Sequence, residues 1–152
     1  MKRQKTLFSI PQLEVSMVRE VQVSDKNFNC SKEIAESEIA KDLKKCDREK
    51  FICIHLNNKN QIISFEVVST GSLTSSIVHP REVYKGAILA NAASVIFMHN
   101  HPSGDPEPSN DDLEITKRLE KAGEILAISV LDHIIVSPKR FFSFRGSNLI
   151  SD

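Results

Sequence analysis

Histidine and acidic residues are concentrated in one short stretch of the chain, HNHPSGDPEPSNDD at positions 99–112. His99 and His101 stand two residues apart at the end of an apolar run, and side chains two apart on a strand point to the same side. Two imidazoles on one side of a strand can share one metal ion. Taken alone the pair is weak evidence, because two histidines also flank an asparagine by chance.

Asp112 is the third candidate ligand. The sequence after the loop predicts a helix with a buried stripe of Ile115, Leu119 and Ala122, and Asp112 lies on that stripe whereas Asp111 does not. A carboxylate directed into a core needs a partner, because burying a bare charge is very costly. A metal ion held by two histidines would be such a partner.

The same aspartate has a local alternative. Ser109 is expected to cap the helix, and together with Asp112 three residues later it resembles a capping box. The histidine pair at the other end of the loop favours the metal. Two histidines and one aspartate are three protein ligands for Zn²⁺ and leave a fourth position for water, which is the pattern of catalytic zinc. The letters HNH are not those of an HNH nuclease, and the cysteine pair of zinc deaminases is missing.

The elements that must position these residues follow from periodicity and turn signals. In chain order the sequence predicts a strand over 13–23, a helix over 31–46, a hairpin over 50–68, a helix over 79–93, a buried strand over 94–100, a helix over 109–123, and strands over 126–136 and 139–144. This alternation predicts an α/β (α+β) fold, a mixed sheet with helices packed on both faces.

Single residues mark the expected ends of the helices. Ser31 is the expected N-cap of the first, whose apolar stripe is Ala35, Ile39, Leu43 and Cys46. Pro80 stands in the first turn of the second, where a missing N–H costs nothing. Gly123 is expected to stop the third.

Composition sets limits on the class of protein. The 152 residues suit one domain, expected over 13–152 with an N-terminal arm over 1–12, and 20 basic and 20 acidic side chains give no net charge. No apolar stretch approaches the ~20 residues that span a membrane. Three cysteines without metal spacing indicate reduced thiols and a cytoplasmic location.

The quoted stretch resembles the JAMM motif of the JAB/MPN metalloprotease superfamily: His-x-His-Pro, a loop, then Ser-x-x-Asp. Residues 78–112, with LDHIIV and FFSF further on, resemble the bacterial RadC family, historically labelled DNA repair proteins, from about Asp47 to Phe144. The resemblance implies a JAB1/MPN-like, cytidine-deaminase-like architecture. The helical N-terminal region of that family has no expected counterpart in residues 1–46.

The resemblance also implies roles for single residues. His99, His101 and Asp112 correspond to the ligands of one Zn²⁺ ion, and Ser109 to the serine that stabilises an oxyanion. The motif's general base is a glutamate at the entry to an early core strand. Glu49 fits that place best, and Glu66 is the second choice.

Asp132 and His133 follow on a later predicted strand. One of the two is expected to contact and orient a zinc-bound imidazole. A packed or surface polar pair is an equally open interpretation.

The implied function is zinc-dependent hydrolysis of an amide or isopeptide bond in a protein or peptide substrate. The alternative is a metal-binding module that is non-catalytic or associated with DNA repair. The neutral charge does not favour DNA as a partner, because phosphate binding needs a basic excess or stripe. A homodimer through the arm and first strand stays open.

Overall fold

A computed structural model of the chain describes residues 28, 30–71 and 78–150, and the structural statements below refer to these residues. The strand that ends in the histidine pair, β3 (Ser94–Asn100), lies at the centre of a five-stranded sheet with the order β2-β1-β3-β4-β5. Its neighbours are β1 (Lys50–Leu56), which runs antiparallel to it, and β4 (Ser129–Val136), which runs parallel. The edge strands are β2 (Ile62–Thr70) and β5 (Phe141–Ser143).

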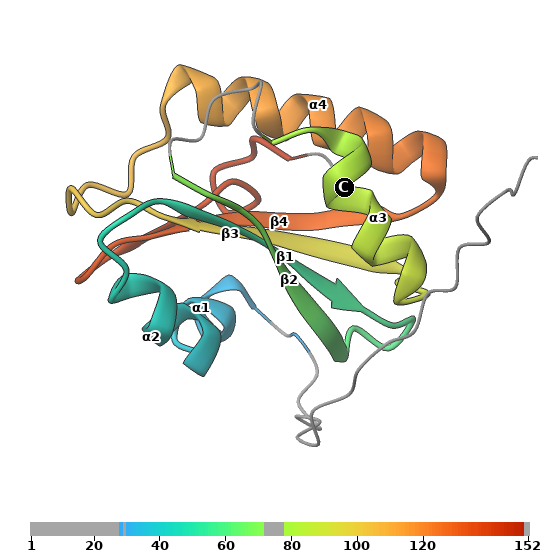
Figure 1. Ribbon diagram of the computed structural model, residues 1–152, viewed down its shortest axis with the longest axis horizontal. Coiled ribbons are helices and arrows are strands. Elements are labelled where there is room, and N and C mark those ends of the chain that lie inside the picture. Colours follow the sequence, from blue (N-terminus) through green and yellow to red (C-terminus); the bar gives the residue numbers. More distant parts are fainter. Residues whose placement is uncertain (1–27, 29, 72–77, 151–152) are drawn as a thin grey trace, which may run out of the picture.

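Helices cover both faces of this sheet (Figure 1). On one face lie α1 (Ser31–Ala35) and α2 (Glu38–Lys44), and on the other lie α3 (Pro80–Leu89) and α4 (Asn110–Leu126). The mixed sheet with helices on both faces confirms the fold class expected from the sequence.

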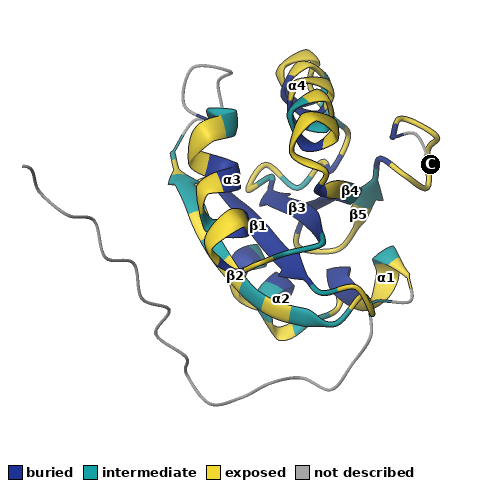
Figure 2. Cartoon of the chain, turned by 90° about the vertical axis from the view of Figure 1, so that its right-hand side faces the viewer, coloured by how far each residue is buried: buried dark blue, intermediate teal, exposed yellow. Residues whose placement is uncertain are grey.

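Every residue of β3 is buried, as expected for a strand covered on both faces (Figure 2). Its side chains alternate between two apolar clusters. Val95 and Phe97 pack with residues of α3 and α4, whereas Ile96 and Met98 pack with residues of α1 and α2. His99 therefore stands near the end of a strand that is buried on both faces.

The predicted hairpin is confirmed, and so is the second predicted helix except for its end, because α3 stops at Leu89 and residues 90–93 are not helical. β1 and β2 pair antiparallel, and the Asn57 side chain accepts hydrogen bonds from the backbone N–H groups of Lys59 and Gln61 in the connecting turn. Pro80 is the first residue of α3, and the His79 side chain caps that helix.

The single helix expected over 31–46 is wrong, because two short helices stand there. Ser37 interrupts them: its hydroxyl donates to the Ile34 carbonyl at the end of α1 and accepts the Ala40 N–H at the start of α2. Ser31 is not an N-cap either. Its hydroxyl donates to the Asp132 carboxylate at 2.5 Å and so ties α1 to β4.

Gly123 does not stop α4, which continues to Leu126 and ends at Ala127 in the left-handed region with φ 55°. The strand expected from residue 126 accordingly begins at Ser129. Gly123 has another purpose: a Cβ there would lie 2.6 Å from both the Ile128 carbonyl oxygen and the Tyr84 hydroxyl. The glycine allows α4 to pack closely on its neighbours.

The strand expected over 13–23 and the arm over 1–12 lie outside the described residues. Within the part of the chain that the structure describes, no helix has the length and apolar character to cross a membrane.

Two substitutions test this account of the end of α4. Ala127→Gly is expected to raise the free energy of unfolding by about 1 kcal/mol, because a Cβ disfavours the left-handed conformation. Gly123→Ala is expected to lower it, although alanine is the better helix former. Chemical denaturation of both variants measures the two signs, and a stabilised Gly123→Ala would contradict the close packing.

Candidate metal centre

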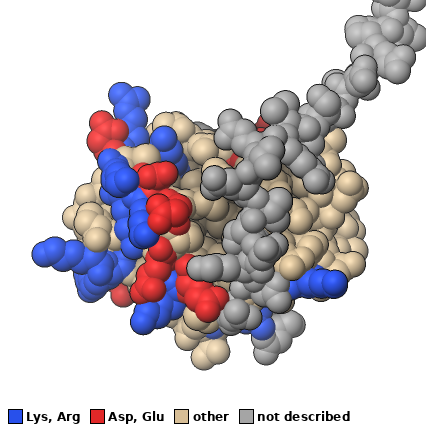
Figure 3. Space-filling view, turned by 90° about the horizontal axis from the view of Figure 1, so that it is seen from below, with Lys and Arg blue, Asp and Glu red and all other residues tan. Residues whose placement is uncertain are grey.

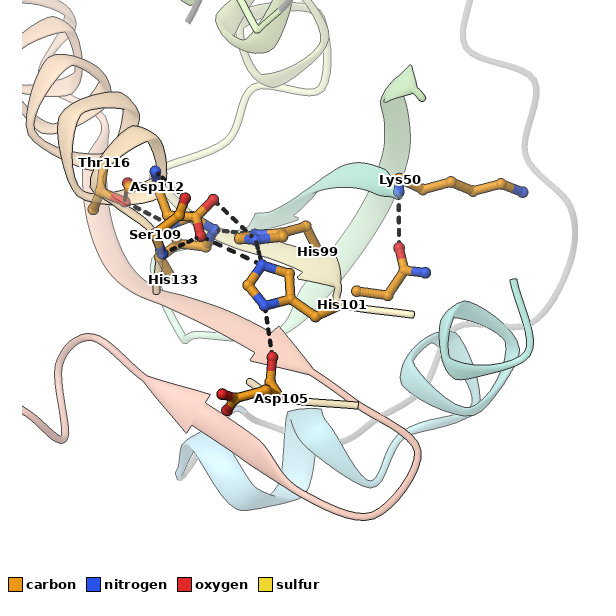
Figure 4. Close-up of polar contacts among 9 residues, drawn as sticks. Lys50, His99, His101, Asp105, Ser109, Asp112, Thr116 and His133 are labelled. Carbon is orange, nitrogen blue, oxygen red and sulfur yellow. Dashed lines mark hydrogen bonds and ion pairs between the residues drawn. The ribbon is translucent and has the colours of Figure 1, made fainter. Parts of the chain in front are cut away.

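The side chains of His99, His101 and Asp112 meet at the end of β3 (Figure 4). The two Nε2 atoms lie 3.0 Å apart. The carboxylate of Asp112 places Oδ1 3.2 Å from Nε2 of His99 and Oδ2 3.3 Å from Nε2 of His101. Within the described residues, this is the one group of three or more His, Cys, Asp or Glu side chains with such convergence.

Backbone contacts hold both histidines on one side. His101 lies one residue beyond β3, and its N–H donates to the Val136 carbonyl of β4 at 2.9 Å, which keeps the chain extended past the strand end. The following loop turns at Gly104, with φ 95°, and leads to α4.

Asp112 closes the capping box and faces the histidines at the same time. The Ser109 hydroxyl accepts the Asp112 N–H at 3.1 Å, and Oδ2 of Asp112 accepts the Ser109 N–H at 2.7 Å. The carboxylate still presents an oxygen to each imidazole. The local and metal interpretations of this residue are therefore compatible.

A chain of hydrogen bonds fixes the proton on His99. The Thr116 hydroxyl uses its only hydrogen to donate to the Asp112 carbonyl at 2.6 Å. It must therefore accept from Nδ1 of His133, 2.6 Å away. Neutral His133 then carries no proton on Nε2, which accepts from Nδ1 of His99 at 2.7 Å. Nε2 of His99 is left with a free lone pair.

Nε2 of His101 also has a free lone pair, and a single hydrogen bond fixes it. Its Nδ1 lies 2.8 Å from the Asp105 carbonyl oxygen, which only accepts, so the proton is on Nδ1. Two Nε2 lone pairs and a carboxylate thus face one another, and a cation between them satisfies all three. Zinc with ligands at 2.0–2.2 Å separates tetrahedral donor atoms by about 3.3 Å, so the donor set fits zinc.

The electrostatics favour neutral imidazoles beside an ionised carboxylate. Burial lowers the pKa of His99 and places that of His133 well below its ordinary value. Burial by itself would raise the pKa of Asp112, but the imidazoles of His101 and His99 that face its carboxylate, together with the Ser109 N–H, hold that pKa well below the ordinary value. The Asp112 carboxylate raises the pKa of His101, because the protonated imidazole can donate a hydrogen bond to it.

Glu49 lies beside this group, just before β1. Phe51 pairs with His99 across the strands and stacks on its ring at 6.1 Å. Glu49 stands two residues before Phe51, so alternation directs its half-buried side chain to the same face. Its negative charge is close enough to raise the pKa of both His99 and His101.

Glu66 lies elsewhere. Glu66 stands on β2 and pairs with Cys53 of β1. Cys53 in turn pairs with Phe97 of β3, two residues before His99. β1 separates β2 from β3, a lateral distance of about 10 Å. The structure therefore brings Glu49, and not Glu66, to the histidine pair.

Of the two residues on β4, His133 contacts a candidate ligand and Asp132 does not. Asp132 is buried, and its carboxylate accepts from the hydroxyls of Ser31 and Ser143 and from the Arg145 N–H. It fastens β4 to α1 and to the segment after β5.

Three further residues with contacts at or beside the site were not predicted from the sequence: Thr116, Asp105 and Asn100. Thr116 follows Asp112 by four residues on the same buried stripe, and a threonine there was a signal for a polar contact in the core. Asp105 acts through its carbonyl, which no side-chain pattern reveals.

Comparison with known proteins identifies one matching family and several similar proteins. The family model described as RadC-like JAB domain matches residues 28–149. A UPF0758 protein of Desulforamulus reducens is 53% identical over 112 residues, 74% of this chain and 49% of that protein. UPF0758 proteins of Methanosarcina acetivorans and Bacillus cereus are 52% and 55% identical over 68% and 64% of this chain, and 45% and 44% of theirs. The chain spans about half the length of these relatives or less.

Removal of the Thr116 hydroxyl tests the hydrogen-bond chain. Thr116→Val keeps the shape but leaves Nδ1 of His133 without an acceptor, so His99 loses its fixed proton. Zinc affinity, measured by competition with a chelating dye, is expected to fall 10–100-fold. The same change at exposed Thr70 is the matched control. Equal affinities for the two variants would contradict the role of the chain.

The raised pKa of His101 predicts how zinc binding depends on pH. The imidazole must be neutral to bind the metal, and a raised pKa keeps it protonated up to a higher pH than an ordinary histidine. Zinc affinity is therefore expected to rise from about pH 6 to 8 with release of about one proton per ion. Calorimetry in buffers of different ionisation enthalpy counts that proton, and a value of zero contradicts the prediction.

Proposed function

Because the chain belongs to the RadC-like JAB domain family, we propose that it is a zinc-dependent hydrolase that cleaves an amide or isopeptide bond in a protein or peptide. One observation carries the proposal. Three donor atoms converge on one point, and the Nδ1 side of each imidazole is already hydrogen-bonded. Ser109 is hydrogen-bonded to Asp112, and the charge of Glu49 acts on both histidines.

Zinc held by His99, His101 and Asp112 would supply a Lewis acid that lowers the pKa of a water ligand from 15.7 to about 7. Glu49 would accept a proton from that water and deliver it to the leaving amine. Positioned proton transfer of this kind contributes roughly 10²–10⁴ to the rate.

Ser109 is suited to bind the oxyanion. Its side chain is exposed, and Oγ accepts the Asp112 N–H in the capping box, so the contacts of the described residues leave its hydroxyl hydrogen available. Donation to the carbonyl oxygen of a substrate would strengthen as negative charge develops there. Loss of one such donor costs about 3 kcal/mol of transition-state stabilisation.

A role in DNA binding has less support. On the face seen in Figure 3, lysine and arginine side chains alternate with aspartate and glutamate and form no stripe of one sign. Charges along α2 pair locally, as in the contact of Lys41 with Glu38 and, at the C-terminal end of the helix, that of Lys45 with Asp42.

Metal analysis combined with two glutamate variants tests the proposal. The purified protein is expected to carry about one zinc per chain, and His99→Ala or Asp112→Ala should lose it. Glu49→Gln should keep the zinc, but its rate of hydrolysis should fall about 10²-fold or more. The substrates are a mixed-sequence fluorogenic peptide library and an isopeptide-linked pair. Glu66→Gln is the matched control and should keep both.

The outcomes separate the alternatives. Zinc uptake without turnover in the wild-type protein would indicate a metal-binding module. Full activity of Glu49→Gln would show that another group is the base.

A further inference from the structure

Asn100, between the two histidines, has its side chain on the opposite face of β3 from theirs. It follows Met98 at strand spacing and so lies on the side of α2, whereas His99 and His101 face α4. It is 1% exposed, and a buried carboxamide needs partners for its donors and its acceptor.

The carboxamide finds all its partners in one short segment. Oδ1 accepts the Lys50 N–H at 2.7 Å, which is the dashed line at Lys50 in Figure 4. Nδ2 donates to the Arg48 carbonyl at 3.0 Å and to the Cys46 carbonyl at 3.3 Å. Two of these three groups stand immediately before and after Glu49.

Glu49 itself is held from the other side. It precedes the first residue of β1, and its carbonyl accepts the Gly71 N–H at 2.7 Å. Glu49 thus depends on Asn100 and Gly71 for its position, and Asn100 lies on the same strand as the two histidines.

We propose that Asn100 is a positioning residue that fixes the Glu49 carboxylate relative to the metal centre. The proposal rests on the proposed function, in which Glu49 is the base. Strand alternation places the odd residues His99 and His101 toward the metal, and the even residue between them holds the segment that carries the base.

The chemistry of the contact requires asparagine. Only a carboxamide offers an acceptor and two donors at the end of a side chain this short. Aspartate would set a carboxylate oxygen against two carbonyl oxygens, and leucine has the same size but makes none of the three hydrogen bonds.

The test uses the Co²⁺-loaded full chain, so that its readout is independent of any substrate. The visible absorption of the bound Co²⁺ is followed with pH, and its midpoint reports the ionisation of the coordinated water. A carboxylate nearby opposes that ionisation, so Glu49→Gln should lower the midpoint by about one pH unit, the shift expected from a charge 4–6 Å away.

Asn100→Leu should lower the midpoint in the same direction, because the carboxylate is then no longer held in place. In the Glu49→Gln background it should cause no further change, which a general loss of stability would not reproduce. Asn57→Leu is the matched control: that side chain also holds backbone N–H groups, but at the other end of β1. Asn100→Ala is a second variant that removes the same three bonds.

The possible results distinguish the positioning role of Asn100 from the proposed hydrolase function. A midpoint unchanged by Asn100→Leu, or lowered equally in both backgrounds, overturns the positioning role while the hydrolase proposal stands. Loss of Co²⁺ binding in both Asn100 variants also overturns it, because the ligands and their hydrogen bonds are untouched. A wild-type chain that binds no Co²⁺ refutes the proposed function and this inference with it.

Discussion

The site depends on two imidazole lone pairs and a carboxylate that face one another at the end of a buried strand. Unpaired polar atoms in such a place are costly. The protein makes the arrangement unavoidable, since Thr116, through His133, and the Asp105 carbonyl occupy the Nδ1 sides of the two rings. The Nε2 atoms then have only one another and Asp112 to face, and a cation is the partner that satisfies all three.

The central strand carries this arrangement because both of its faces are used. One face packs Phe97 toward α4 and presents His99 at its end, and the other packs Met98 toward α2 and presents Asn100. A strand buried on both sides has little freedom, so its last side chains start from a fixed backbone. Residues far apart in the sequence, such as His99 and Asp112, therefore meet at one point.

The parts of the molecule that could be predicted were those set by local spacing. The His-x-His pair, the inward stripe of Asp112 and the buried run of β3 all follow from the periods of strands and helices. The choice between Glu49 and Glu66 depends on register across three strands, which no local pattern contains. Gly123 was misinterpreted for a similar reason: its purpose is set by Tyr84, on another helix.

Asp112 belongs to the helix and to the candidate donor set at the same time. Its carboxylate accepts the Ser109 N–H and lies at the N-terminal end of α4, where the helix dipole favours a negative charge. The apolar clusters on the two faces of the sheet pack from residues outside the donor set. Structural zinc sites supply folding energy outright, whereas the core clusters of this chain are built from other residues. This separation of the candidate donor set from the core is the arrangement expected of a catalytic rather than a structural metal site.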